Sequence, residues 1–410
     1  MTELSNMESE FTYDLTVIIP AYNAENSIAR AVNSVRQSNY LTPIEILIVD
    51  DFSSDKTCRL IEELQHCDPD LKLIRHDKNS GAGVARNTGL ALASGRYITF
   101  LDADDYYIEN QLTNVLTQAI ELCPDVLVFK YQVVNQKNEL QPSLLASDNL
   151  VWSKLASSCA RTLTLAQVLP VLRLAGYPWN KMVSANYARR VGMKYSSTYV
   201  LNDIFAHFQV LLQASAIIVC DIPVVRHVFE STRAQLSNVR DHRRTAALVV
   251  LDEIDTLFTD CPALLKYKPY FNALERDLFS WMLGQAMTEQ RSEISARFFA
   301  RQENRKQQVS IINSQRHRLI IYGLGWQMWK FYDLLNAHHE VVAWMDSDIA
   351  KADATILGLP VFHPTQVDLP PHDLIVVCSS FYEEISNTLH NAGITNVVSL
   401  EKLIPDAWIL

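Results

Sequence analysis

Residues 16–51, TVIIPAYNAENSIARAVNSVRQSNYLTPIEILIVDD, contain a β-branched apolar run, an amphipathic helical stretch and a second apolar run. The same alternation continues to Phe129 and predicts strands over residues 16–19, 45–49, 71–75, 97–101 and 126–129. Such alternation is typical of an α/β fold, a mostly parallel sheet with helices on both faces. Because these sheets bind ligands beyond the carboxyl ends of their strands, the residues that follow each strand form the candidate site.

The composition is that of a globular protein, and it limits the partners to be expected. The 410 residues are 48% hydrophobic and 20% charged, and this length predicts two or three domains. The 46 acidic and 36 basic residues give a net charge of -10, which argues against a nucleic-acid partner. Seven scattered cysteines, without the paired spacing of a metal site, favour a reducing cytoplasmic location.

The polar start and the short apolar runs predict neither export nor a membrane span. The first residues, MTELSNMESE, are acidic where a secretory signal needs a basic start and an apolar stretch. No apolar run approaches the roughly 18 residues of a membrane span, so we expect any membrane contact to be peripheral.

Aromatic and acidic residues follow the first two predicted strands. The run VIIPAYN places Pro20, Ala21, Tyr22 and Asn23 at the sheet edge, where an aromatic ring can pack on a nucleobase. Asp51 follows the second strand, and its carboxylate can accept hydrogen bonds from a base or a ribose. The competing interpretations are ordinary packing for the ring and helix capping for the carboxylate.

Two further motifs point to the same edge. Residues 79–95, NSGAGVARNTGLALASG, combine small residues with Arg86, which can pair with phosphate oxygens or can lie on a helix surface. The fourth strand ends in LDADD, where Asp102, Asp104 and Asp105 would repel one another. A hard cation, Mg2+ or Mn2+, would compensate them and could also neutralise a departing diphosphate; the alternative is a solvated acidic turn.

Taken in order, PAYN, VDD with a following Ser-Asp, ARNTGL and the DxD-type LDADD resemble the family 2 glycosyltransferases of the GT-A fold. The resemblance covers about the first 240 residues. It implies an inverting, metal-dependent transfer of a sugar from a nucleotide diphosphate, with a UDP-sugar as the expected donor. The acceptor would be a hydroxyl in cell-surface polysaccharide or glycoconjugate synthesis.

The resemblance also assigns roles to individual residues. Asp102 would contact the ribose and Asp104 the metal, and the nucleotide site would comprise these two residues with Pro20, Ala21, Tyr22, Asn23, Asp51, Arg86 and Ala103. Phe52 departs from the pattern, because the family usually has glycine at its position.

The predicted acceptor side contains one candidate catalytic base. Residues 200–212, VLNDIFAHFQVLL, resemble the family's ED motif, with Asn202 in place of the usual glutamate and Asp203 retained. An inverting transfer needs a base for the acceptor hydroxyl, and Asp203 is our candidate; a helix N-terminal role is the alternative. Trp179 could stack on a sugar or belong to the core, and His227 lies where the family has a loop over the diphosphate.

A second α/β pattern follows residue 316, with strands expected over residues 319–322, 341–345, 374–378 and 397–400. Gly323 and Gly325 follow the first of these strands, and Asp346 ends the next, which is much of a dinucleotide fingerprint. Met328 stands where that fingerprint has its third glycine. The region resembles the Rossmann-like module of nucleotide-sugar modifying and sugar acyltransferase proteins, and would bind a nucleotide or serve in assembly.

These patterns divide the chain into four predicted parts. They are a polar tail (1–14), a GT-A domain (15–240) with a nucleotide-sugar half (15–130) and an acceptor half (131–240), a helical connector (241–315) and a Rossmann-like domain (316–410).

The partners to be expected are a nucleotide-diphosphate sugar donor and a saccharide or lipid-linked saccharide acceptor. Peripheral contact with the inner membrane, through a helix face with Arg297, Arg301 and Arg305, and a homo-oligomer are further expectations. A solvated helix face is the alternative for the arginines.

Two rival functions remain open. One is a non-catalytic nucleotide-sugar or glycan binding protein, suggested by Asn202. The other is an NAD-linked oxidoreductase acting through the C-terminal domain, against which Met328 and the lack of a convincing Tyr-x-x-x-Lys pair argue.

Overall fold

A computed structural model describes most of the chain as two compact units, Met1–Lys268 and Pro269–Leu410. The division falls inside the predicted connector. The described residues are 11–37, 43–142, 146–155, 161–229, 245–268, 271–272, 274–275, 278, 297, 301, 316–324, 332, 335–336, 339–366, 368–378 and 382–400.

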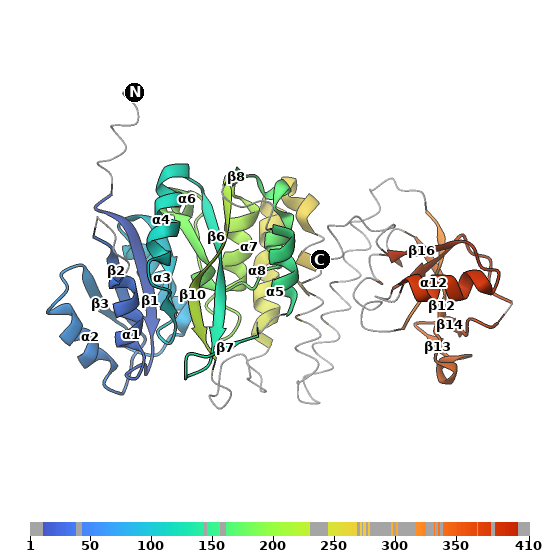
Figure 1. Ribbon diagram of the computed structural model, residues 1–410, viewed down its shortest axis with the longest axis horizontal. Helices are drawn as coiled ribbons and strands as arrows, with labels where there is room; N and C mark the ends of the chain where they lie inside the picture. The colour runs from blue at the N-terminus through green and yellow to red at the C-terminus, as the bar shows by residue number, and fades with distance from the viewer. Residues whose placement is uncertain are drawn as a thin grey trace, which may run out of the picture. The chain divides into compact units, whose positions relative to one another are not determined.

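The first unit is built on one large, mainly parallel sheet (Figure 1). Its N-terminal part consists of parallel strands in the order β3-β2-β1-β4. They are β1 (Tyr13–Ala21), β2 (Glu45–Asp50), β3 (Leu71–Arg75) and β4 (Gly95–Phe100), and each overlaps a predicted strand. The apolar runs of β1, β2 and β4 are buried between two layers of helices, whereas the edge strand β3 is only partly buried.

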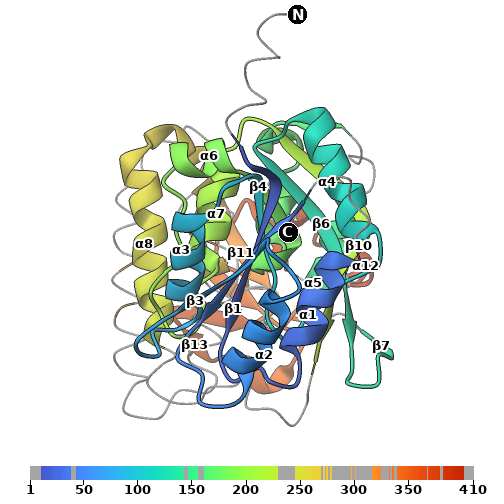
Figure 2. The same cartoon turned by 90° about the vertical axis from the view of Figure 1, so that its left-hand side faces the viewer.

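Helices cover both faces of this sheet, as Figure 2 shows. One face is covered by α1 (Ile28–Arg36), α2 (Thr57–Gln65) and α4 (Gln111–Leu122). The other is covered by α3 (Ala82–Leu92), α6 (Ala185–Arg190), α7 (Ile204–Leu212) and α8 (Ala246–Asp260). The predicted α/β fold with helices on both faces is therefore confirmed.

The sheet continues into the predicted acceptor half. From β4 the order is β9-β6-β10-β5, with β9 antiparallel to both of its neighbours and β10 parallel to β6. The strands are β5 (Tyr106–Tyr107), β6 (Val126–Val134), β9 (Lys181–Ser184) and β10 (Ile217–Val228); β7 (Leu140–Gln141) and β8 (Thr162–Leu163) pair with β6 and β10.

The sequence pattern predicts no strand between residues 129 and 319, and this is wrong for β9 and β10. The strand β9 has only four residues and leads directly into α6, so its sequence pattern is too short to be distinguished from that of the helix. The pairing of β10 with β6 shifts register around Pro223, which interrupts the alternation expected of a strand.

Short elements complete the first unit. They are α5 (Ala146–Leu155), η2 (Leu165–Gln167), η3 (Leu169–Arg173), η4 (Pro178–Asn180) and η7 (Pro262–Tyr267). The helix α8 packs against α7, and its buried residues include Leu248, Leu251 and Ile254.

The second unit is a smaller, separate sheet in the order β13-β14-β12-β11-β15-β16. Neighbouring strands are parallel except for β13 and β14, and apolar clusters cover both faces. The elements are β11 (Arg318–Tyr322), β12 (Glu340–Met345), η8 (Ile349–Lys351), β13 (Thr355–Ile356), β14 (Leu359–Phe362), β15 (Leu374–Val377), α12 (Tyr382–Asn391) and β16 (Val397–Ser399).

The predicted fingerprint of this unit is only partly described. Gly323 follows β11 with a φ of 96°, and Asp346 follows β12, as predicted. The Asp346 carboxylate accepts hydrogen bonds from Leu324 N and Lys351 Nζ, at 2.9 and 3.0 Å. The other residues of the fingerprint, Gly325 and Met328, lie outside the described residues.

The arginine face of the predicted connector is also only partly described. Arg301 pairs with the buried carboxylate of Glu275, so its side chain is engaged within the protein. Arg297 is exposed, and Arg305 lies outside the described residues. Among the helices that the structure describes, none is both long and apolar enough to cross a membrane.

Candidate active site

Asp51, at the end of β2, anchors the loop that leads into α3. Its two carboxylate oxygens accept hydrogen bonds from Ser80 N at 2.9 Å and Gly81 N at 2.7 Å. The Nδ1 atom of His76 lies 2.8 Å from Oδ1. Since a carboxylate has about four acceptor positions, Asp51 can hold this loop and still accept one further hydrogen bond.

The turns after β1 and β2 are joined by hydrogen bonds. Asn23, which has a left-handed φ of 48°, donates from its backbone N to Ser53 Oγ at 2.9 Å and accepts from Ser54 N at 2.9 Å. Pro20 and Ala21 lie within β1 and are buried, so they position the backbone. Tyr22, by contrast, is 49% exposed at the sheet edge.

Arg86 connects three segments of the predicted site. Its side chain on α3 is buried, and Nη2 donates to Asp102 Oδ1 at 2.6 Å after the end of β4. Nη1 donates to Asn202 Oδ1 at 2.7 Å, in the turn before α7. The alternative of a surface arginine is therefore wrong. The structure brings Arg86, Asp102 and the Asn202–Asp203 turn together.

Gly83 explains why α3 can approach that turn so closely. A Cβ atom on this residue would lie 2.2 Å from Ser196 O and 2.9 Å from Asn202 Cβ. Both distances are shorter than real Cβ contacts, so glycine is required here if the turn is to stay in place.

The acidic motif after β4 separates its three carboxylates. Asp102 pairs with Arg86, and Asp105 is fully buried with both oxygens 3.0 Å from His227 Nδ1. Ala103 is buried between them, and Asp104 is partly exposed, its backbone oxygen accepting from Arg30 Nη2 at 2.6 Å. The alternative of a fully solvated acidic turn is therefore wrong.

His227 adds a positive charge to this region. Burial by itself would lower its pKa, but the charge of Asp105 and the hydrogen bond to that carboxylate raise the pKa to about 9. The Asp105 carboxylate thus favours the protonated form of the imidazole, while burial raises the pKa of Asp105 itself. The carboxylates of Asp102 and Asp104 also raise this pKa, so the cation lies within the electrostatic reach of the acidic motif.

The acidic motif suits a metal ion that is shared with a ligand. In the described part of the chain, no group of three or more His, Cys, Asp or Glu side chains could hold a metal ion by itself. Mg2+ is commonly bound through one or two carboxylates plus substrate phosphates. The partly exposed Asp104 and the neighbouring Asp102 could supply the one or two carboxylates of such a site.

Asp203 lies at the N-terminus of α7, and its side chain makes no capping hydrogen bond. Burial raises its pKa, although the nearby Arg86 guanidinium opposes that shift. A carboxylate with a raised pKa is a better proton acceptor than an ordinary aspartate once it is ionised. The position and the raised pKa of Asp203 are therefore compatible with a role as the general base.

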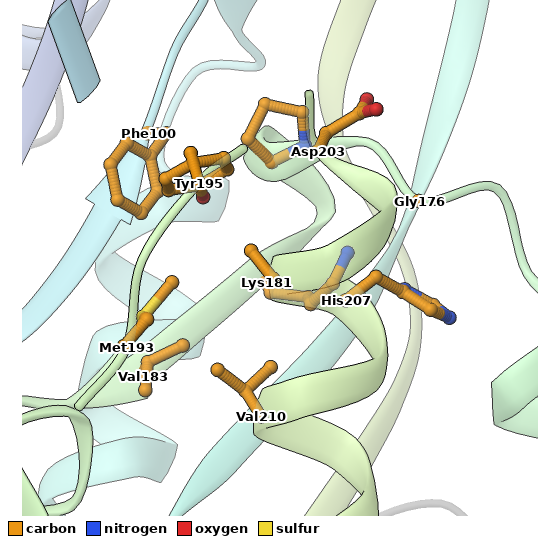
Figure 3. A pocket seen from close by; sticks show the side chains of 11 residues that line it. Phe100, Gly176, Lys181, Val183, Met193, Tyr195, Asp203, His207 and Val210 are labelled. Atoms are coloured by element: carbon orange, nitrogen blue, oxygen red, sulfur yellow. The ribbon is translucent and has the colours of Figure 1, made fainter. Parts of the chain in front are cut away.

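A small cavity of about 10 Å³ lies beside Asp203. Figure 3 shows Lys181 and His207 lining it, with the Asp203 carboxylate at its rim, pointing away from Val210. Burial lowers the pKa of Lys181 to about 7, while Asp203 and Asp148 oppose the shift. The cavity is close to the size of one water molecule, so it is not the donor site.

Trp179 belongs to the core and does not offer a face to a sugar. It is 0% exposed and stacks on Tyr177, with ring centroids 4.5 Å apart, and on His227, at 5.5 Å. The core interpretation of Trp179 is thus confirmed.

Sequence reasoning missed the contacts of His76, Tyr177 and Lys181. His76 directly follows the predicted strand over residues 71–75, so the rule that ligand-binding residues follow strand ends could have found it. Tyr177 and Lys181 follow no predicted strand, and the signal that could have found Lys181 was its position between the Trp179 segment and an apolar run.

Family models match both parts of the chain. The model described as "Glycosyl transferase family 2" matches residues 16–163, and the model described as "C2185-like, N-terminal" matches residues 315–397.

Two curated relatives illustrate what the first part is similar to. The UDP-Glc:alpha-D-GlcNAc-diphosphoundecaprenol beta-1,3-glucosyltransferase WfgD of Escherichia coli is 34% identical over 147 residues, which is 36% of this chain and 56% of that one. The poly(ribitol-phosphate) beta-N-acetylglucosaminyltransferase TarS of Staphylococcus aureus is 34% identical over 122 residues, 29% of this chain and 21% of that one. The chain thus spans about half of the first relative and a fifth of the second.

A solved structure has a similar fold. TarS residues 1–349 from S. aureus, in complex with UDP-GlcNAc, superpose with a TM-score of 0.51 and 20% identity. The superposition covers 68% of this chain and 74% of that one. The likeness supports the GT-A architecture of the sheet described above.

Proposed function

We propose, on the premise that residues 16–163 belong to glycosyl transferase family 2, that the chain is an inverting glycosyltransferase using a nucleotide-diphosphate sugar, a UDP-sugar above all. The observation that carries the proposal is the Arg86 network. One buried guanidinium joins Asp102, at the predicted nucleotide site, to the turn that presents the predicted base Asp203. The candidate donor and acceptor residues are thereby held by a common set of contacts.

In this proposal the chain's own residues divide the work between donor and acceptor. Tyr22 and Asp51 bind the nucleoside, Arg86 holds the Asp102 carboxylate toward the ribose, and Asp203 accepts the proton of the acceptor hydroxyl. Asp104 would hold Mg2+ or Mn2+, which when bound neutralises negative charge on the diphosphate. The pair of His227 with Asp105 holds the end of the acidic motif in place beside Asp104.

The proposed acceptor is a saccharide or a lipid-linked saccharide in cell-surface polysaccharide synthesis. The printed name of the E. coli relative specifies an undecaprenol-linked acceptor. A lipid-linked acceptor would bring a cytoplasmic enzyme to the inner face of the membrane, so we include peripheral membrane contact and a homo-oligomer in the proposal. Sedimentation with anionic and neutral liposomes, and light scattering of the purified chain, test these two points.

The decisive experiment is a screen of nucleotide sugars for slow hydrolysis in the presence of Mn2+. The expected result is turnover of one UDP-sugar by the full chain and its loss in Asp104→Ala. Asp260→Ala, which removes an exposed carboxylate at the end of α8, is the matched control and should hydrolyse the donor at the wild-type rate.

The same screen separates an enzyme from a binding protein. A binding module would show affinity for a nucleotide sugar without turnover, and that result would contradict the proposal. Unchanged hydrolysis in Asp104→Ala would contradict the metal assignment alone.

A further inference from the structure

We propose that Phe52 adds a second stacking surface beside Tyr22, so that the two rings form an aromatic clamp for the nucleobase of the donor. This inference rests on the proposed function, because it assigns a ligand group to an edge of the same site. It differs from the pattern that the sequence resembles, where glycine usually stands at the position of Phe52.

The two rings emerge from neighbouring strand ends. Ala21 and Asp50 are the last paired residues of β1 and β2, and Asp51 N then donates to Ala21 O at 2.8 Å. Tyr22 is the residue after Ala21 on the first strand, and Phe52 is the residue after Asp51 on the second. The two side chains therefore leave adjacent backbones at the carboxyl edge of a parallel sheet, where ligands of α/β sheets bind.

Both rings are exposed, although their neighbours are buried. Phe52 is 52% exposed and Tyr22 is 49% exposed, whereas Ala21 and Asp51 are only 2% and 3% exposed. Two adjacent half-exposed aromatic side chains contribute little to the core. Their flat faces are suited to a flat aromatic ligand, and stacking on such rings does not depend on which base is bound.

The backbone of Phe52 is strained, although the turn itself does not require a phenylalanine. Its φ is 70°, in the left-handed region that a bulky side chain rarely adopts. The turn is fixed by other groups, since Ser53 N donates to Asp50 Oδ2 at 3.1 Å and Asn23 N donates to Ser53 Oγ. Glycine would make this turn without strain, and with 52% of its surface exposed the Phe52 side chain does not serve to fill the core.

The positive charge of Arg75 adjoins this turn. The Arg75 guanidinium lies 3.6 Å from Asp50 Oδ2, through Nε, and donates from Nη2 to Ser53 O at 3.5 Å, so it contacts the residues on both sides of the Asp51–Phe52 pair. A guanidinium next to a stacking site is a donor for the carbonyl oxygens of a pyrimidine base. The edge thus combines stacking surfaces with a hydrogen-bond donor.

The test measures binding of UDP and of inorganic pyrophosphate, which has no base, to the full chain by titration calorimetry with Mn2+ present. We expect Phe52→Leu and Phe52→Gly to lose about 5-fold or more in affinity for UDP and to bind pyrophosphate as the wild type does. Phe52→Tyr, which keeps an aromatic face, should retain wild-type affinity for UDP.

Thermal stability provides an independent readout. Phe52→Gly should melt at the same temperature as the wild type or higher, because glycine relieves the left-handed strain. Affinity for UDP should therefore fall without any loss of stability, which a damaged fold cannot produce.

Each remaining outcome is decisive. If Phe52→Leu binds UDP as tightly as the wild type, or if pyrophosphate binding falls in parallel with UDP binding, the clamp is refuted while UDP binding by the wild type still supports the proposed function. If the wild type binds no UDP, the proposed function and the clamp both fail.

Discussion

Asn202 is the residue at which this chain departs most informatively from the motifs that it resembles. Its amide oxygen accepts from Arg86 and adds no negative charge to the network. The Arg86 guanidinium therefore keeps its full charge, which pairs with Asp102. The same charge opposes the rise in the pKa of Asp203 that burial causes. A glutamate at this position would offset part of that charge.

The variant Asn202→Asp tests this electrostatic role. It keeps an acceptor for Arg86 but adds a negative charge, which disfavours ionised Asp203 and raises the pKa of that carboxyl. Because a base must be ionised to accept a proton, the acidic limb of the kcat/KM profile against pH should move to higher pH. Asn186→Asp on the exposed face of α6 is the matched control and should leave the limb in place.

The variant Asp203→Asn tests the base itself. Removing a general base typically lowers the rate on the order of 100-fold or more, and we expect that loss in transfer to acceptor. Affinity for UDP should be unchanged, since Asp203 belongs to the acceptor side in our proposal. Transfer at the wild-type rate by this variant would remove Asp203 from the mechanism.

At the scale of elements, Glu45 shows how the N-terminal strands are held in register. Its fully buried carboxylate accepts from Thr16 Oγ1 at 2.6 Å, Lys72 Nζ at 2.8 Å and Ser94 N at 2.9 Å. These donors lie on β1, on β3 and just before β4, so one side chain of β2 joins the strands whose ends carry the predicted nucleotide site.

This cluster makes the stability of the first unit depend on pH. Burial would raise the pKa of Glu45, but the hydrogen bonds from Lys72, Thr16 and Ser94 outweigh it and lower the pKa. The stabilisation is therefore fully present above the unfolded pKa, about 4.3, and is lost as pH falls through the folded pKa.

The variant Glu45→Gln should reveal that dependence. We expect a loss of about 1–3 kcal/mol near neutral pH, because hydrogen bonds to a charged group are weakened, and a narrowing gap to the wild type in acid. Calorimetric melting temperatures measured from about pH 3 to 7, a range that spans the titration of a carboxyl group, check this. Glu63→Gln, which alters an exposed pair with Arg59, should change little at any pH.

Helix α3 gives a second prediction at this scale. In Gly83→Ala the new Cβ would collide with Ser196 O, so the turn before α7 must move away from α3. We expect reduced donor hydrolysis and a lower melting temperature, because Asn202 would be drawn away from Arg86. Wild-type activity in this variant would show that the turn can move without disturbing the Arg86 network.

At the scale of the whole molecule, each unit has its own sheet and its own buried core. The predicted nucleotide, metal and base residues all belong to the first unit. The second unit contains a glycine turn and an acidic residue after neighbouring strands, but the Asp346 carboxylate is engaged by Leu324 N and Lys351.

We therefore predict that residues 1–268 alone fold and hydrolyse the donor at a rate within about 3-fold of the full chain, since separate cores make separate domains. Comparison of circular dichroism, melting temperature and hydrolysis between the two chains tests this. If the shorter chain folds but is inactive, the second unit contributes to activity.

Nicotinamide fluorescence titration of the full chain tests the rival oxidoreductase function. We expect no binding of the nicotinamide cofactor.

The sequence by itself determined the α/β class, the N-terminal strands and the order of polar motifs at their carboxyl ends. These features are local: an apolar run of β-branched residues encodes a strand, and the residue that follows it must lie at the sheet edge. Tyr22, Asp51, Asp102 and Asp104 could be named as a candidate site for that reason.

Only the tertiary structure decided which of these residues touch. Arg86 meets Asn202 across 116 positions of sequence, and His227 meets Asp105 across 122. Such contacts depend on strand order and helix packing, and β9 enters the sheet between β4 and β6 although its four residues carry no distinctive pattern. The left-handed turn at Phe52 likewise depends on the hydrogen bonds between neighbouring strand ends, which no local sequence pattern contains.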